Sequence, residues 1–374
     1  MPTHVLKLAS PPRTIPKYLN ALTVALVAAF SVAGCSVQTS TSQTEKPAKS
    51  YTVWPEPPDE ARYIFEAQLR NVYDIHKETD EERRRRVLTG GPVNRDEPAF
   101  LKPAALAARN GRVYVADPPT SSIVVFDLRR GRVFQIGVRE PNRTTNPVAL
   151  AIDGQNNVYV LDGKRRQVLV FDSLGLFLYA VGDPKAITKP AGVAVSNNGQ
   201  KVFIVDRGSV EEDDHKVIAY APDGKELFRI GPRGSGPGQL NIPLAATVTK
   251  DDKLLVLDSG NFRIQAYDLN GKHQLSFGSL GNGLGQFSRP RSIAADGEGR
   301  IFVSDASFNN TQIFNEAGKL LMSIGIPSMN NLPGNFGLIG ALAADETGRL
   351  YVADQYHRKV EVYRPADAKV QSTK

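Results

Sequence analysis

The chain holds a single cysteine among 374 residues, so no disulfide can form within it. Its main apolar stretch, Ala21 to Ala33, is apolar except for Thr23 and Ser31 and is shorter than the about 20 residues that a membrane-spanning helix needs. There is no GxSxG elbow and no phosphate-binding loop. The few histidines show no metal-ligand spacing such as HxxxH; those after the first residues are His76, His215, His273 and His357. These absences argue against a disulfide scaffold, a permanent membrane span and the common hydrolase or nucleotide chemistries.

The segment before the apolar run is basic and contains no carboxylate, with Lys7, Arg13 and Lys17 as its charges. A basic start, a short apolar run and small residues at its end are typical of an export signal. The closing residues, Val32 to Cys35, resemble the bacterial lipobox, in which a peptidase cuts before a lipid-modified cysteine. An ordinary signal peptide and a small buried thiol remain as alternatives for this segment.

The lipobox resemblance implies a leader over residues 1–34 and acyl chains on Cys35. Several acyl chains make a stable membrane anchor where one alone binds marginally. Residue 36 is serine rather than the aspartate that retains many such proteins at the inner membrane, which implies the outer membrane. The polar stretch that follows predicts a flexible lipidated tether over residues 35–59.

The charge balance is mild. The net charge of +7 falls to near +4 without the three basic residues of the leader, which is too little to predict a nucleic-acid partner. The 32 glycines and 25 prolines predict many turns, and short strands punctuated by turns are typical of an all-β protein.

One phrase occurs six times, at intervals of 44 to 52 residues, in forms such as "GRVYVAD", "DKLLVLD" and "GRLYVAD". An aromatic residue lies nine positions after the aspartate in five copies, and the third copy carries an insertion of five residues. A strand of small residues precedes each phrase. Each unit therefore predicts four short antiparallel strands, and six such units predict a six-bladed β-propeller. The terminal aspartates are Asp117, Asp162, Asp206, Asp258, Asp305 and Asp354.

The sixth unit has too little chain for its fourth strand. The segment "ARYIFEAQL", residues 61–69, has strand character and no repeat of its own. We expect it to supply the missing strand, because pairing of the first and last segments removes an exposed sheet edge. The expected propeller covers residues 60–365, and residues 366–374 form a disordered tail.

The repeat, together with "GSGPGQL" and "GNGLGQF", resembles the NHL-repeat β-propeller family, a TolB-like architecture, over about residues 60 to 365. The basic position of the family pattern is kept as Arg263 and Lys359 but is Ser122, Gln167 and Asn310 in other units. Some NHL-type propellers are lyases that act on peptidyl-hydroxyglycine, and related six-bladed propellers are calcium-dependent lactonases. The resemblance therefore implies these two enzyme classes as possible activities. The first needs clustered histidines and the second needs inward-facing acidic or amide side chains.

The innermost predicted strands are almost free of such groups. The sequence therefore predicts no catalytic residue, no metal and no cofactor, with a lyase or lactonase at the central axis as the alternative. The six aspartates have an expected structural role, because a carboxylate that ends a strand can accept backbone N–H groups and set the next turn.

Loops between the second and third strands lie on the same side of a propeller as those joining consecutive blades. We expect this side to bind an envelope protein or an anionic polysaccharide, with no small-molecule substrate. Arg289, Arg291, Lys185 and Lys189 fall on the same side. The candidate partner-binding residues are Arg139, Arg143, Lys164, Arg165, Arg166, Arg233, Arg263, Phe308, Tyr356, His357 and Arg358.

Two further segments stand apart from the repeat. "KETDEERRRRVL", residues 77–88, predicts a short solvated helix, because Thr79 with Glu82 resembles a capping box. A docking patch is its alternative. The acidic "EEDD" in the loop from Arg207 to Lys216 predicts a solvated loop rather than a calcium site, since it lacks an EF-hand arrangement.

Overall fold

The computed structural model describes residues 52–76, 78–90, 96–209 and 213–367. The predicted leader, Cys35, most of the predicted tether and the tail from residue 368 lie outside the described residues, as do Glu211 and Glu212 of the acidic loop. Within the described part of the chain, no helix has the length and apolar character to cross a membrane.

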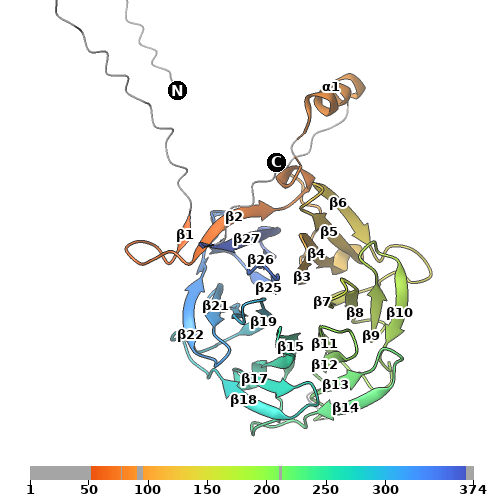
Figure 1. Cartoon of the computed structure of the whole chain (residues 1–374), viewed down its shortest axis with the longest axis vertical. Helices are drawn as coiled ribbons and strands as arrows, with labels where there is room; N and C mark the ends of the chain where they lie inside the picture. The colour runs from red at the N-terminus through yellow and green to blue at the C-terminus, as the bar shows by residue number, and fades with distance from the viewer. Residues whose placement is uncertain (1–51, 77, 91–95, 210–212, 368–374) are drawn as a thin grey trace, which may run out of the picture. The chain divides into compact units, whose positions relative to one another are not determined.

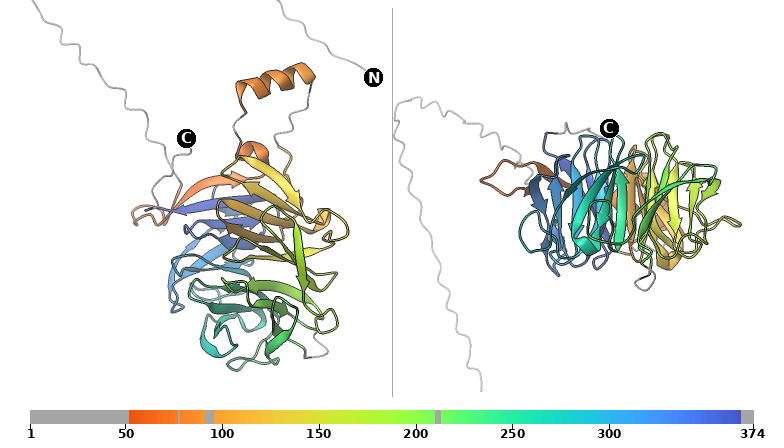
Figure 2. Two further views of the ribbon diagram at one scale, coloured as in Figure 1. Left: turned by 45° about the vertical axis from the view of Figure 1, so that its right-hand side comes forward. Right: turned by 90° about the horizontal axis from the view of Figure 1, so that it is seen from below.

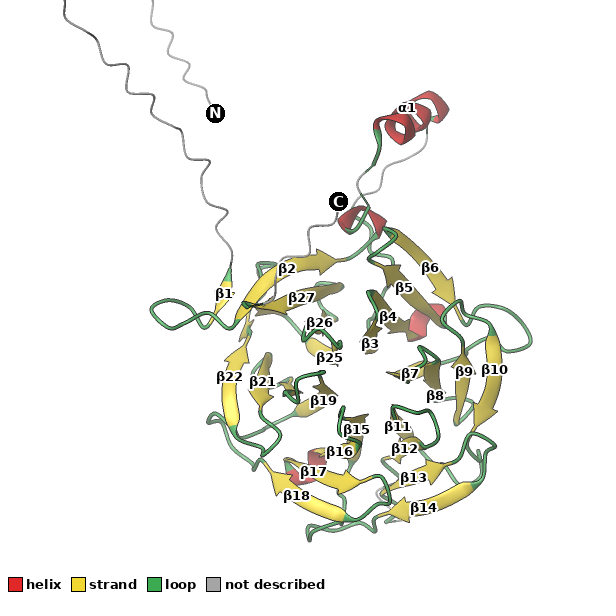
Figure 3. Ribbon diagram, in the orientation of Figure 1, coloured by secondary structure: helices red, strands yellow, loops and turns green. Residues whose placement is uncertain are grey.

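Six antiparallel sheets stand around a central axis, as Figure 1 shows from above. The predicted six-bladed β-propeller with four antiparallel strands per blade is therefore confirmed. The edge-on view in Figure 2 shows that the strands run between two faces of the ring. Figure 3 shows how little of the ring is helical.

The first three blades follow each other in sequence, each with its first strand nearest the axis. Blade one contains β3 (Ala105–Arg109), β4 (Arg112–Asp117), β5 (Ser122–Asp127) and β6 (Arg132–Ile136). Blade two contains β7 (Pro147–Ile152), β8 (Val158–Asp162), β9 (Gln167–Phe171) and β10 (Phe177–Val181). Blade three contains β11 (Pro190–Val195), β12 (Val202–Asp206), β13 (Lys216–Tyr220) and β14 (Glu226–Ile230).

The remaining blades repeat this plan. Blade four contains β15 (Pro243–Val248), β16 (Lys253–Asp258), β17 (Arg263–Asp268) and β18 (His273–Phe277). Blade five contains β19 (Pro290–Ala295), β20 (Ile301–Asp305), β21 (Asn310–Phe314) and β22 (Leu320–Ile324). Blade six contains β25 (Ile339–Ala344), β26 (Leu350–Asp354), β27 (Lys359–Pro365) and the early strand β2 (Tyr63–Leu69).

The hydrophobic core lies between the blades. The second strands read as nearly continuous apolar runs such as "VYVLD" in β8, because they are buried on both faces of their sheet. Six hydrophobic clusters result, and each one joins two neighbouring blades, including blade six with blade one. Each blade thus buries its apolar side chains only against its neighbours, so the ring must close to complete the core.

The N-terminal strand closes the ring, as predicted. β2 pairs antiparallel with β27, and its register joins Tyr63 to Pro365 and Leu69 to Val360. A short strand β1 (Val53–Trp54) pairs with the outer side of β2. The ring of Trp54 packs edge-on against Tyr363, with 5.0 Å between the ring centroids.

The only α-helix of the described residues is α1 (Asp80–Thr89), which lies outside the ring of blades (Figure 1). The predicted capping box is present: the Thr79 side chain accepts from the Glu82 N–H at 3.2 Å, and the Glu82 carboxylate accepts from the Thr79 N–H at 2.8 Å. Single-turn helices and a short parallel pair complete the described elements: η1 (Val72–Asp74), η2 (Pro118–Thr120), η3 (Ser259–Asn261), β23 (Ile326–Pro327) and β24 (Asn335–Phe336).

Candidate functional site

The antiparallel strand order gives the ring two chemically different faces. We call the side with the links between second and third strands, and between consecutive blades, the loop face. The opposite side carries the tight turns that join first to second and third to fourth strands, and we call it the turn face. All the predicted partner-binding residues fall on loop-face segments.

The six repeat aspartates end the second strands and are fully buried. Each carboxylate accepts N–H groups from the inter-blade loop that precedes its own blade, as Asp162 does from Thr145 at 2.6 Å and Asp305 does from Ser288 at 2.7 Å. The other four accept from Leu101 and Lys102 (Asp117), Thr188 and Lys189 (Asp206), Asn241 (Asp258), and Gly337 and Leu338 (Asp354). These carboxylates hold the loop face onto the blades.

Arg263, one of the predicted partner-binding residues, is engaged inside the fold. It lies directly across the sheet from Asp258, with its Nε 2.9 Å from that carboxylate. Its other guanidinium nitrogens donate to three carbonyls of the preceding loop, those of Ser235, Gly236 and Gln239. The guanidinium nitrogens of Arg263 therefore donate hydrogen bonds within the fold rather than to a partner.

Several other candidates also hold loops. The His357 ring lies between the Asp354 carboxylate, at 2.6 Å from Nδ1, and the Met329 carbonyl, at 3.1 Å from Nε2. Arg233 pairs with Asp213 at 2.5 Å. Further loop contacts run from Arg165 to the carbonyls of Pro141 and Arg143, and from Arg166 to that of Ile187.

The remaining candidates present exposed or half-buried side chains on the loop face. Arg139, Arg143 and Lys164 are exposed on adjoining segments of blades one and two. Arg358 and Tyr356 are exposed at blade six, while Phe308 is half-buried at blade five. Arg166 is exposed although it makes one contact. The free basic surface is thus smaller than the predicted set.

A channel along the axis widens toward each face. Six side chains line both of these wider parts, one from the first strand of each blade. All six are apolar: Leu106, Leu150, Val193, Ala246, Ile293 and Leu342. This apolar waist follows from the composition of the first strands, whose residues are mostly small or apolar where the six sheets converge.

The loop-face mouth of this channel has a volume of about 520 Å³ and is basic. Lys102 and Arg291 line it, together with the polar residues Asn146, Ser292 and Gln355, and none of the described lining residues is acidic. Burial, with the nearby Arg289 and Arg207, lowers the pKa of Arg291.

Lys102 was missed by the sequence analysis, and Arg291 was placed on the loop side but left out of the candidate partner-binding residues. The sequence signal for Arg291 was present, because it is a charged residue in a first strand that is otherwise small or apolar, "PRSIAA". Lys102 carried no such signal.

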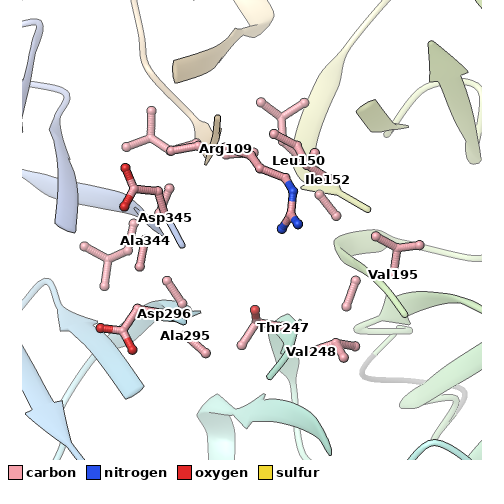
Figure 4. A pocket seen from close by; sticks show the side chains of 18 of the residues that line it. Arg109, Leu150, Ile152, Val195, Thr247, Val248, Ala295, Asp296, Ala344 and Asp345 are labelled. Atoms are coloured by element: carbon pink, nitrogen blue, oxygen red, sulfur yellow. The ribbon is translucent and has the colours of Figure 1, made fainter. Parts of the chain in front are cut away.

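The turn-face mouth has a volume of about 400 Å³. Figure 4 shows the Arg109 guanidinium pointing into it. The carboxylates of Asp296 and Asp345 line the same mouth, but both are occupied: Asp296 accepts from the Arg300 Nε at 2.6 Å, and Asp345 accepts from the Tyr351 hydroxyl at 2.9 Å.

The described residues contain no group of three or more His, Cys, Asp or Glu side chains that could hold a metal ion. One mouth is basic, and the carboxylates of the other already accept hydrogen bonds: Asp296 and Asp345 within their turns, and Glu346 from the Asn110 N–H of blade one. The geometry is suited to holding an anionic or apolar group.

No protein-family model and no curated protein matches the chain. Among solved structures it is similar to a protein of unknown function from Bacteroides thetaiotaomicron, with 13% identity and a TM-score of 0.57 over 72% of this chain and 70% of that one. It is also similar to a streptogramin B lyase, with 13% identity, a TM-score of 0.52 and coverage of 71% and 95%. A third similar structure is a gluconolactonase from Xanthomonas campestris, with 18% identity, a TM-score of 0.52 and coverage of 71% and 88%. At these identities the likeness shows the propeller fold.

Proposed function

We propose that the protein is a non-catalytic binding module: an NHL-type propeller exported as a lipoprotein and anchored in the outer membrane through Cys35. Its loop face holds an acidic envelope protein or an anionic polysaccharide. The observation that carries this proposal is the basic loop-face mouth, where Lys102 and Arg291 face a channel mouth without a carboxylate among its described lining residues.

The surrounding surface supports the same partner chemistry. Arg139, Arg143 and Lys164 are exposed on the loop face around blades one and two. Exposed charges of one sign raise the association rate of an oppositely charged partner. Because these side chains stand on loops fixed by the buried aspartates, they are presented by a rigid scaffold.

A second candidate is a metal-dependent lyase or lactonase at the axis, favoured by the names of two similar structures. Elemental analysis of the purified chain separates the two proposals: about one tightly held calcium or zinc ion per chain supports the enzyme. The apolar waist and the basic mouth favour the binding module, because the waist side chains carry no oxygen and the described lining residues of the basic mouth include none of the carboxylates that calcium sites use.

The test uses immobilised polygalacturonate and, separately, co-purification from detergent-solubilised membranes. The variant Arg139→Gln/Arg143→Gln/Lys164→Gln removes three loop-face cations. A matched control, Lys225→Gln/Lys272→Gln/Lys319→Gln, removes three exposed cations from the turn face. We expect the first variant to lose binding at 0.15 M salt while the control keeps it. Equal loss in both variants would show that only net charge matters and would contradict the proposal.

A further inference from the structure

The turn face carries a second basic concavity, between blades one and two, that sequence reasoning missed. Its volume is about 310 Å³, within the range of about 300 to 1,000 Å³ of small-molecule sites. We call it the arginine pocket. It is lined by Arg109, Asn110, Arg112, Tyr114, Asp127, Arg129, Arg130, Ile152, Asn156 and Ser173.

Two of its four arginines are fixed by a single carboxylate. Asp127 accepts from the Arg112 Nε at 3.0 Å and from the Arg130 guanidinium at 3.1 Å. The Arg112 guanidinium also donates to the Ser173 carbonyl of blade two. Burial alone would raise the pKa of Asp127, but the bonds from Arg130 and Arg112 outweigh it and lower that pKa. Asp127 is thus charged and fully used.

The other two arginines have no counter-ion. The guanidinium groups of Arg109 and Arg129 form no ion pair or hydrogen bond with any residue that the structure describes. The neighbouring carboxylates are committed elsewhere: Glu346 accepts from the Asn110 N–H at 2.9 Å, and Asp172 accepts from the Leu174 N–H at 2.8 Å. Four guanidinium groups therefore meet one lining carboxylate.

We propose that the arginine pocket binds a small ligand through a tetrahedral oxyanion group, a phosphate or a sulfate ester. A guanidinium is planar and presents paired N–H donors that match two oxygens of such a group. Arg129 supplies free donors, and so does Arg109 at the edge that the arginine pocket shares with the turn-face mouth. Arg112 is held in a fixed position by Asp127 and Ser173 and forms one side of the pocket. This site lies on the face opposite the proposed partner surface and does not depend on it.

The test titrates the purified full-length chain with inorganic pyrophosphate at low salt by calorimetry, and repeats it with sulfate and acetate. Pyrophosphate or sulfate is expected to bind, and the tighter of the two identifies the source of the oxyanion. Arg109→Gln and Arg129→Gln should each weaken binding by roughly tenfold or more, the loss expected for one charge-assisted contact. The control Arg84→Gln removes the same charge from the exposed helix α1, outside the ring of blades, and should leave binding unchanged.

Three results would overturn the proposal. The first is absence of pyrophosphate and sulfate binding in a chain that melts as a folded protein. The second is equal weakening by Arg84→Gln, or acetate binding as tight as that of pyrophosphate, since either shows a response to charge alone. The third is weakening by Arg109→Gln without weakening by Arg129→Gln, which places the anion in the turn-face mouth that Arg109 also lines.

Discussion

The ammonium of Lys359 and the carboxylate of Glu361 lie 2.6 Å apart inside blade six, and neither side chain has exposed surface. Lys359 also donates to the Asn335 carbonyl at 3.0 Å, and Glu361 accepts from the Gly334 N–H at 3.0 Å. The pair therefore clamps the loop between blades five and six. It is a buried ion pair within the scaffold rather than a binding feature.

In blades four and five, a single glutamine side chain holds the corresponding loop in place of the ion pair. In blade four, Gln265 accepts from the Gly238 N–H at 3.0 Å and donates to the Gln239 carbonyl at 2.6 Å. In blade five, Gln312 makes the corresponding bonds to Gly285 and Gln286, at 2.7 Å each. Each clamp joins a glycine N–H to a side chain 27 residues later, so the three loops are held in equivalent positions.

Breaking the ion pair should be costly. Glu361→Ala leaves the Lys359 charge buried without a partner, which we expect to lower the free energy of unfolding by about 3 to 5 kcal/mol. The double variant Lys359→Asn/Glu361→Gln copies the residues of blade five and should lose less than Glu361→Ala alone. Urea unfolding of the variants measures this, and a double variant less stable than Glu361→Ala would contradict the equivalence of the clamps.

The buried strand-end carboxylates should make stability depend on pH. Burial would raise the pKa of Asp162, but the N–H groups of Arg165 and Thr145 lower it on balance, and the pKa of Asp354 is also lowered. A carboxylate with a depressed folded pKa contributes its full stabilisation above its unfolded pKa of about 4 and loses it as the pH falls through the folded value. We therefore expect the melting temperature to drop below about pH 4.

Asp162→Asn checks the origin of that drop. Its loss of charge-assisted hydrogen bonds should lower the free energy of unfolding by about 1.5 to 3 kcal/mol at pH 7. The variant should also show a shallower fall in melting temperature between pH 5 and pH 3 than the unmodified chain. An unchanged slope would mean that other carboxylates govern the acid sensitivity.

Ring closure gives a third prediction. A chain that begins at residue 52 keeps β1 and β2 and should fold, whereas one that begins at Arg70 exposes the edge of β27 and part of the cluster between blades five and six. Exposed strand edges pair with other chains, so we expect the shorter chain to aggregate on size-exclusion chromatography. A monomeric, cooperatively melting shorter chain would show that the fourth strand of blade six is dispensable.

The six-bladed ring was predictable because its signal is periodic: a strand of small residues, an aspartate and an aromatic at fixed spacing. The closing strand was predictable because the sixth unit lacked its fourth strand and residues 61–69 had strand character outside the repeat. The roles of the loop-face arginines were harder to predict, since loop position does not say which donors are already used. For Arg263 a signal existed, because strand pairing places the residue five after Asp258 directly across from that carboxylate. The arginine pocket had a weaker signal, as it joins turns of two blades through Arg112 and Ser173.

Arg263 and Arg358 should therefore behave differently although both are basic loop-face residues. Arg263→Gln removes an ion pair to the buried Asp258 and several loop contacts, so we expect it to lower the free energy of unfolding by at least about 1.5 kcal/mol. Arg358→Gln changes an exposed side chain and should stay within about 0.5 kcal/mol. Thermal and urea unfolding of the two variants decide this, and equal destabilisation would contradict the division between basic residues that hold the loops and those left for a partner. If partner binding then falls in Arg358→Gln without a loss of stability, the loss belongs to the surface, whereas a loss of binding in Arg263→Gln follows from loosened loops.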